Sequence, residues 1–106
     1  MTIRVEDVVD RNRLELYEGD TPIGRLEYQR ARDLLVIEHT EVSRDHRGQG
    51  RAGQLVKAAL DQAKGERRRV IVVCPYAKGW LLRHPEYADL DYTKDDATPA
   101  AVPPPG

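Results

Sequence analysis

The sequence predicts a single α+β domain built on a mixed, mostly antiparallel sheet, and three observations support this prediction. The first third of the chain alternates apolar and polar residues with a period of two, as half-buried strands do. Residues 52–64 repeat apolar side chains at helical spacing. A β-branched run at residues 70–73 follows, so we expect a strand, a crossover helix and a second strand parallel to the first.

The first three strands are expected to form an antiparallel meander joined by short turns. The first begins at Ile3, and a polar turn at residues 10–13 separates it from a second strand that contains Leu14. A glycine-containing turn at residues 18–20 leads into the third strand. The residues expected on one face of that strand are Gly24, Leu26 and Tyr28.

Two apolar runs predict strands that are buried on both faces. Residues 34–37 and residues 70–73 are apolar at every position, which is typical of strands inside a covered sheet. The first run continues into His39 and Glu41, where the pattern becomes polar and ionisable. Such side chains must point either to solvent or into a cleft beside the sheet.

The clearest helix is expected at residues 52–64, and Gly65 is expected to end it. Its apolar stripe contains Ala52, Leu55, Val56, Ala59, Leu60 and Ala63. A short helix at residues 77–83 should end before Pro85. Residues 93–106 are rich in proline and lack a core-forming pattern, so we expect a domain at residues 1–92 and a disordered tail.

Composition limits the class of protein. Seventeen Lys and Arg against eighteen Asp and Glu give a formal charge of -1, which argues against nucleic acid or anionic membrane as a partner. No apolar run reaches the ~18 residues of a membrane span, and the N-terminus lacks a signal-peptide core. A single cysteine, Cys74, forms neither an intrachain disulfide nor a cysteine metal cluster. We therefore expect a cytoplasmic protein without a metal, of unspecified oligomeric state.

The most informative segment is residues 47–53, which holds three glycines just before the long helix. Glycines lower stability unless the backbone must approach a ligand closely, and a helix N-terminus offers free amides and positive charge to a phosphate. Arg44, Arg47 and Arg51 add cations. The spacing matches neither the P-loop nor the dinucleotide fingerprint. The segment predicts an anion site, and its alternative is a flexible turn that only leads into the helix.

The segment Arg47-x-x-Gly50-x-Ala52 resembles the Arg/Gln-x-x-Gly-x-Gly/Ala pyrophosphate loop of the GNAT superfamily of acyl-CoA-dependent N-acetyltransferases. The resemblance spans roughly residues 20–92 and is strongest to the very small, YjdJ-type members. Other matching pieces are His39-Thr40-Glu41-Val42, Leu55-Val56, Cys74-Pro75-Tyr76 and Arg83-His84-Pro85-Glu86-Tyr87.

The resemblance implies an acetyl-CoA-dependent N-acetyltransferase that acts by direct attack of a primary amine, either a small amine or an exposed protein amine. It also implies parallel strands that splay near Val42 and Val73, with Val42 contacting the pantetheine arm through its backbone. The residues implied to hold the pyrophosphate are Arg47, Gly48, Gln49, Gly50, Arg51, Ala52 and Gly53. Arg51 and Ala52 depart from the residues most usual at their positions.

Acetyl transfer needs a neutral amine and a hydrogen-bond donor for the carbonyl oxygen of the thioester. The leaving thiolate needs either a proton or a stabilising electrostatic field. His39 and Glu41 have the same parity on a strand, so they should share one sheet face, and either could accept the proton. Their alternative role is that of solvated strand-end groups. Cys74 could be a nucleophile that forms an acetyl-cysteine, or a small buried hydrophobe.

The proton donor for the thiolate is the least defined group. In many GNAT enzymes it is a tyrosine on the helix after the second parallel strand, but Trp80 stands at that position and cannot act as an acid. Tyr76, His84 and Tyr87 are other donors, and each could instead have a packing role. Trp80 also motivates the alternative function, a non-catalytic acyl-CoA-binding module.

Overall fold

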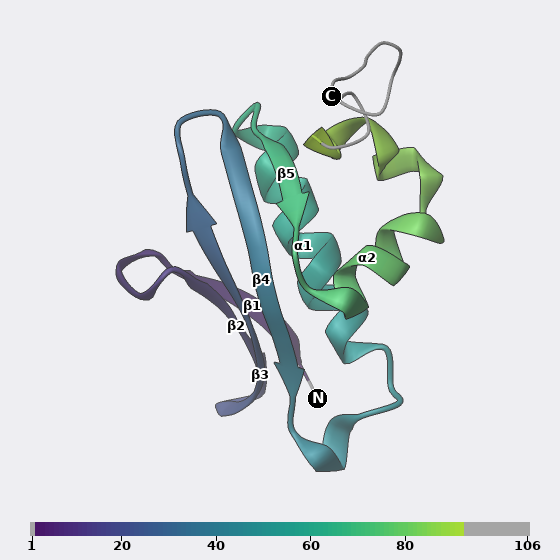
Figure 1. Ribbon diagram of the computed structural model, residues 1–106. Helices are drawn as coiled ribbons and strands as arrows, with labels where there is room; N and C mark the ends of the chain where they lie inside the picture. Colours follow the sequence, from purple (N-terminus) through teal and green to yellow (C-terminus); the bar gives the residue numbers. More distant parts are fainter. Residues whose placement is uncertain (1, 93–106) are drawn as a thin grey trace, which may run out of the picture.

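A single sheet with strand order β1-β2-β3-β4-β5 organises the computed structural model, which describes residues 2–92 (Figure 1). The strands are β1 (Ile3–Val8), β2 (Arg13–Glu18), β3 (Thr21–Arg30), β4 (Leu34–Val42) and β5 (Arg69–Val72). The α-helices are α1 (Arg51–Gly65) and α2 (Pro75–Leu82), and the short 3-10 helices are η1 (Val9–Arg11), η2 (Arg44–His46) and η3 (Pro85–Leu90). The tail expected at residues 93–106 lies outside the described residues. None of the helices described is long and apolar enough to cross a membrane.

Strand pairing confirms the predicted α+β class. Strands β1 to β4 pair antiparallel in chain order, and α1 carries the chain over to β5, which pairs parallel to β4. The parallel pairing ends at Ile37 and Val72, whereas β4 continues to Val42. The amides of Val73 and Cys74 still donate to the Ile37 carbonyl, and the chain then turns into α2. Beyond Ile37, the edge of β4 that faces away from β3 therefore has no strand beside it (Figure 1).

A β-bulge sets the orientation of this free half of β4. Glu27 pairs with His39 and Tyr28 with Ile37, so Glu38 has no partner and the side-chain alternation changes phase. Before the bulge Ile37 faces α1, and after it Val42 does. Because the amide of Ser43 donates to the Ile23 carbonyl of β3, the backbone groups of Val42 point to the open edge.

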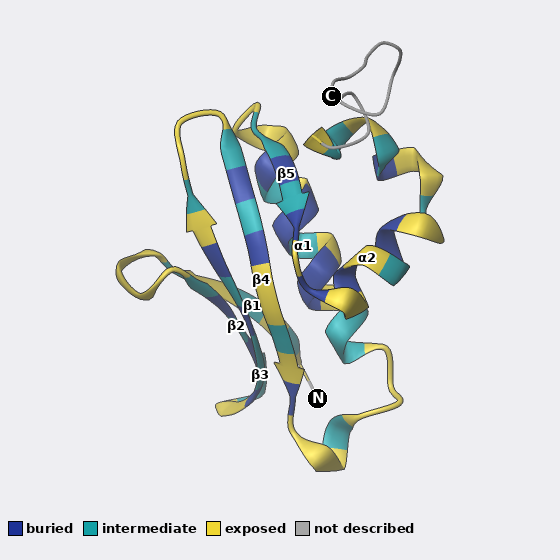
Figure 2. Cartoon of the chain, viewed as in Figure 1, coloured by how far each residue is buried: buried dark blue, intermediate teal, exposed yellow. Residues whose placement is uncertain are grey.

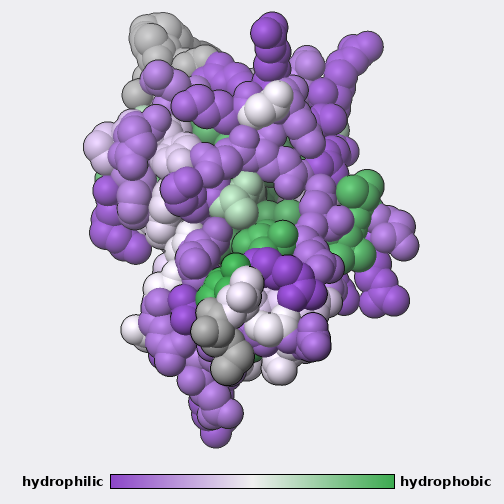
Figure 3. Space-filling model, turned by 180° about the vertical axis from the view of Figure 1, so that it is seen from behind, coloured by the Kyte–Doolittle hydropathy of each residue, from purple (hydrophilic) through white to green (hydrophobic). Residues whose placement is uncertain are grey.

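The core lies between α1 and one face of the sheet, and buried residues alternate with less buried ones along most of β2, β4 and β5 (Figure 2). Strands contribute Leu14, Leu16, Leu26, Tyr28, Leu35, Ile37, Val70 and Val72, and α1 contributes Leu55, Val56, Ala59, Leu60 and Ala63. The apolar stripe predicted for the long helix is therefore confirmed. Seen from behind, the molecule is mostly hydrophilic with a few small hydrophobic patches (Figure 3).

The prediction that residues 34–37 and 70–73 are buried on both faces was wrong. Leu34, Val36 and Ile71 are only half-buried, and Val73 is 56% exposed. The reason is that, within residues 2–92, no helix packs on the face opposite α1, which we call the outer face. In addition, β5 is an edge strand of the described sheet.

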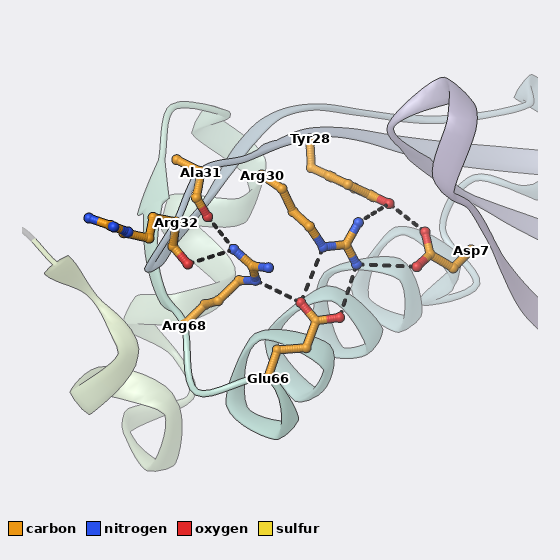
Figure 4. A network of polar contacts seen from close by, with 7 residues as sticks. All are labelled: Asp7, Tyr28, Arg30, Ala31, Arg32, Glu66 and Arg68. Atoms are coloured by element: carbon orange, nitrogen blue, oxygen red, sulfur yellow. Dashed lines mark hydrogen bonds and ion pairs between the residues drawn. The ribbon is translucent and has the colours of Figure 1, made fainter.

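The far end of the sheet is tied to the end of α1 by a polar network (Figure 4). Arg30 contacts Asp7 at 3.3 Å and Glu66 at 3.0 Å and donates to the Tyr28 hydroxyl at 2.9 Å. Arg68 donates to two carbonyls of the β3–β4 turn and to Glu66. The hydrogen bond from Arg30 holds the pKa of Glu66 below its usual value. These contacts fix α1 to the sheet at the end away from residues 47–50.

Gly24 lets β3, the end of β4 and α1 pack closely, and its replacement tests this packing. A Cβ there would lie 2.9 Å from the Glu41 carbonyl oxygen and 3.3 Å from Leu55. Gly24→Ala should lower the free energy of unfolding in urea by about 1–3 kcal/mol. Gly65→Ala is the control, because a Cβ at Gly65 meets nothing within 4 Å, and it should raise that free energy by about 0.4–1 kcal/mol. Equal stability of the two variants would contradict the packing.

Candidate functional site

A hollow of about 430 Å³, here called the loop hollow, opens where β4 runs past the end of β5. Its walls come from β4, η2, the glycine-containing loop, the first turn of α1 and the start of α2. The lining residues are Thr40, Val42, His46, Arg47, Gly48, Gly50, Arg51, Ala52 and Tyr76. Of the predicted pyrophosphate residues, Gln49 and Gly53 are not in the lining.

The loop leaves backbone amides of α1 free at the hollow. Gly48 and Gly50 have φ of +82° and +76°, in the left-handed region that glycine adopts most readily. No side chain caps α1 at Gly50, and the first helical hydrogen bond runs from the amide of Gln54 to the Gly50 carbonyl at 3.2 Å. The three amides before Gln54 therefore lack helical partners and, with the helix dipole, favour an anion.

Two arginines add positive charge and link the loop to β4. Arg47 Nε donates to the Val42 carbonyl at 3.2 Å. Arg51 Nη1 donates to Gln54 Oε1 at 3.1 Å, whereas its Nε is buried and has no hydrogen-bond partner among residues 2–92. A buried donor without an acceptor costs free energy, so an anionic group bound in the hollow would relieve that cost. The residues present thus fit a phosphate-bearing ligand.

His46 and Thr40 line the hollow but did not emerge from the sequence. His46 lies in a hydrogen-bonded chain with Ser43 Oγ at 2.8 Å and Glu18 Oε1 at 2.9 Å, which ties η2 to the end of β2. The sequence feature that could have pointed to His46 as a site residue is its position directly before Arg47. Thr40 faces the hollow only because of the bulge at Glu38, which a period-two pattern cannot show.

Gly53 serves the contact between α1 and α2. A Cβ on Gly53 would lie 2.9 Å from Trp80 Nε1 and 3.5 Å from the Tyr76 hydroxyl oxygen. The hydroxyl of Tyr76 and the indole of residue 80 therefore reach the same point beside the first turn of α1. Tyr76 is 41% exposed and lines the loop hollow, whereas Trp80 is buried.

The other two donors considered from the sequence have packing roles. His84 stacks on Trp80 with ring centroids 3.6 Å apart and donates from Nδ1 to the Trp80 carbonyl at 2.7 Å. Tyr87 is buried and donates to Asp61 at 2.6 Å, and this hydrogen bond raises the pKa of the Tyr87 hydroxyl. Neither lines the loop hollow.

Cys74 is buried at the start of α2, and its thiol donates to Thr40 Oγ1 at 3.6 Å. No basic side chain makes a hydrogen bond with it among residues 2–92, so the described contacts match those of a small core residue. In the same part of the chain, no group of His, Cys, Asp and Glu side chains is arranged to hold a metal ion.

His39 and Glu41 share the outer face, as their parity predicts, and contact each other. His39 Nε2 lies 3.3 Å from Glu41 Oε1, and Arg25 Nη2 of β3 lies 3.0 Å from the same oxygen. Because an ionised carboxylate only accepts, Nε2 of His39 is the donor in this contact, and the tautomer that makes it leaves Nδ1 as an acceptor. Both residues are about half exposed, at 53% and 48% of their side chains.

The fold and the loop hollow are compatible with binding of a phosphate-bearing ligand, and comparison with known sequences establishes the family. Residues 13–90 match the sequence model of the GCN5-related N-acetyl-transferases. The chain therefore belongs to this family of N-acetyltransferases, whose members use acetyl-CoA. No curated protein matches the sequence.

Solved structures share the fold at low sequence identity. A GCN5-like protein from Staphylococcus aureus has a TM-score of 0.63 and 24% identity, over 85% of this chain and 86% of that one. The ribosomal-protein-alanine N-acetyltransferase of Brucella melitensis has a TM-score of 0.56 and 21% identity, over 94% and 68%. The diaminobutyrate acetyltransferase of Paenibacillus lautus, solved with L-2,4-diaminobutyric acid and coenzyme A, has a TM-score of 0.53 and 18% identity, over 74% and 51%.

Gly53→Ala should displace Trp80, because the new Cβ would lie 2.9 Å from the indole nitrogen. Trp80 is the single tryptophan of the chain, so its fluorescence reports directly on the contact between α1 and α2. We expect a shift of its emission to longer wavelength as the ring becomes more exposed. Gly65→Ala, in the same helix but with open space at its Cβ, should leave the emission unchanged. An unchanged emission in Gly53→Ala would contradict the placement of Trp80.

Proposed function

We propose that this chain transfers the acetyl group of acetyl-CoA to a primary amine by direct attack of the amine. The observation that carries the proposal is the continuity of the loop hollow with the open edge of β4. One end offers free amides and an unpartnered arginine nitrogen to a diphosphate, and the other offers the backbone of Val42 to an extended arm. The diaminobutyrate enzyme that shares the fold binds coenzyme A.

The pyrophosphate-binding segment is proposed to be residues 47–53. Five of its residues, Arg47, Gly48, Gly50, Arg51 and Ala52, line the hollow, whereas Gln49 and Gly53 lie outside the lining. The amides of residues 51–53 and the Arg51 side chain supply the donors. Val42, with Thr40 beside it, would contact the pantetheine. When bound, acetyl-CoA supplies the acetyl group as an activated thioester.

The outer face supplies the base. His39, oriented by Glu41 through Nε2, accepts a proton from the amine at Nδ1, while Arg25 holds the carboxylate of Glu41 in place. The thioester on the open edge of β4 is reached from both faces of the sheet, because β5 no longer pairs with β4 there. In the transfer a carbon–nitrogen bond forms, the carbon–sulfur bond breaks and the amine loses one proton.

Tyr76 is the proposed donor of a proton to the leaving thiolate. Its hydroxyl approaches the point that the ring of residue 80 also reaches, and it lines the loop hollow. The Tyr76 hydroxyl can therefore act as the general acid in place of the tyrosine hydroxyl that is absent at position 80. Cys74 makes no hydrogen bond with a basic side chain within residues 2–92, which favours direct transfer over an acetyl-cysteine.

A non-catalytic acyl-CoA-binding module is the second candidate function, and Trp80 at the expected position of the general acid is the observation that favours it. In that case the loop hollow would bind the ligand without turnover. Assignment to the small YjdJ-type subgroup and a cytoplasmic location rest on the sequence alone.

Gly50→Trp tests the binding site, because the indole would fill the hollow. The substitution also adds about 1–2 kcal/mol of backbone strain. Gly19→Trp, at a turn with φ of +60° outside the hollow, carries similar strain and is the control. Calorimetry should show coenzyme A affinity reduced at least 100-fold in Gly50→Trp and unchanged in Gly19→Trp. Equal affinities in the two variants would contradict the assignment of the loop hollow as the coenzyme A site.

Release of free thiol from acetyl-CoA with a panel of amines tests the catalytic roles. His39→Gln and Tyr76→Phe should each lower kcat by about 10²–10⁴-fold, the usual contribution of a general base or acid, with coenzyme A affinity retained. Cys74→Ala is the matched variant that should keep most of its turnover. Tight binding without turnover by the unaltered chain would favour the binding module, and loss of turnover in Cys74→Ala would favour the covalent route.

A further inference from the structure

A second hollow lies on the outer face, beside the catalytic pair, and its chemistry differs from that of the loop hollow. This outer hollow has a volume of about 280 Å³, slightly below the ~300–1,000 Å³ of typical ligand clefts, so it suits a small molecule. The polar side chains in its walls are Arg13 and Glu15 of β2, Arg25 of β3, Glu41 of β4 and Ser43.

From this hollow we propose that the acetyl acceptor is a small amino carboxylate, a molecule that carries a primary amine and a carboxylate together. The inference deepens the proposed acetyl transfer and rests on it. Two guanidinium groups and two carboxylates line the hollow. Because the charges of the lining balance, a polyamine or an aminoglycoside finds no net negative field there, and a simple alkylamine would leave the guanidinium groups unused. A zwitterion is complementary to both kinds of charge.

The unused hydrogen-bonding atoms give the ligand an orientation. Both oxygens of Glu15 are engaged: Oε1 accepts from Tyr17 at 2.8 Å, and Oε2 accepts from Arg13 Nε at 2.8 Å and lies 2.7 Å from Arg13 Nη2. Glu15 therefore holds Arg13 in place, and Nη1 of Arg13 makes no hydrogen bond within residues 2–92. The carboxylate of the acceptor binds at this guanidinium.

The amine end of the acceptor lies at Glu41. Its Oε1 contacts both His39 and Arg25, whereas Oε2 has no hydrogen-bond partner in the described part of the chain. Oε2 is thus available to the ammonium group of the bound acceptor. Arg25 is the register partner of both Glu15 and Glu41, so the anion-binding and cation-binding ends are two strand spacings apart, about 10 Å between backbones.

Matched pairs of acceptors test the proposal with the full chain and acetyl-CoA. The pairs are β-alanine with propylamine, 5-aminopentanoate with pentylamine and L-lysine with cadaverine, and the readout is release of thiol. Within each pair the carboxylated amine should have a kcat/KM at least 10-fold higher. Equal rates within the pairs, or faster turnover of a lysine-containing peptide without acidic residues, would overturn the proposal and leave acetyl transfer intact.

Variants of Arg13 separate recognition of the carboxylate from the chemistry. Arg13→Gln should raise KM for 5-aminopentanoate at least 10-fold and leave KM for pentylamine and kcat unchanged, and Arg13→Lys should restore most of the loss. Arg32→Gln, on the exposed β3–β4 turn, is the control and should change neither constant. Equal changes for the two amines in Arg13→Gln would contradict the assigned role.

Failure of the proposed function has a different signature, namely coenzyme A binding without thiol release from any amine. The acceptor site is then tested by binding alone. In the presence of coenzyme A, 5-aminopentanoate should shift the NMR signal of the Arg13 Nε–H group, and pentylamine should not. Absence of a shift, or the same shift with both compounds, would overturn the acceptor assignment.

Discussion

The arrangement of the site depends on one constraint, the loss of pairing between β4 and β5 after Ile37. Backbone N–H and C=O groups of a strand need partners, and within the described chain the free half of β4 pairs with another strand only on the side of β3, while Arg47 donates to the Val42 carbonyl on the other side. The edge toward the loop hollow is therefore an extended row of hydrogen-bonding groups. A pantetheine arm has amide groups of its own, so it can form hydrogen bonds with such an edge as an added strand does.

The bulge at Glu38 gives the free half of β4 two chemically different faces. Thr40 and Val42 face the loop hollow on the side of α1, whereas His39 and Glu41 lie on the outer face. One strand thus places ligand-binding groups and proton-transfer groups on opposite sides of the same edge. Gly24 supports this placement because its missing side chain lets the end of β4 approach both β3 and α1.

The sequence was sufficient for the features that depend on local periodicity. The stripe of α1, the strand pattern, the glycine loop at a helix start and the contact between His39 and Glu41 all follow from spacing along one element. Features that depend on a change of register or on distant packing could not be predicted in this way. The bulge inverts the face of Thr40, and Gly53 faces Trp80 from a different helix. Leu34 and Val36 were predicted to be buried because apolarity alone does not show which sheet face lacks a helix.

A titration of the ¹⁵N-labelled chain with coenzyme A, followed through its amide NMR signals, tests the central claim most directly. We expect the largest shifts on the amides of Gly48 and residues 50–53 and on those of Thr40 and Val42, because these amides lie closest to the proposed diphosphate and pantetheine positions. Shifts confined to the β3–β4 turn or to β1, with those amides unmoved, would contradict it.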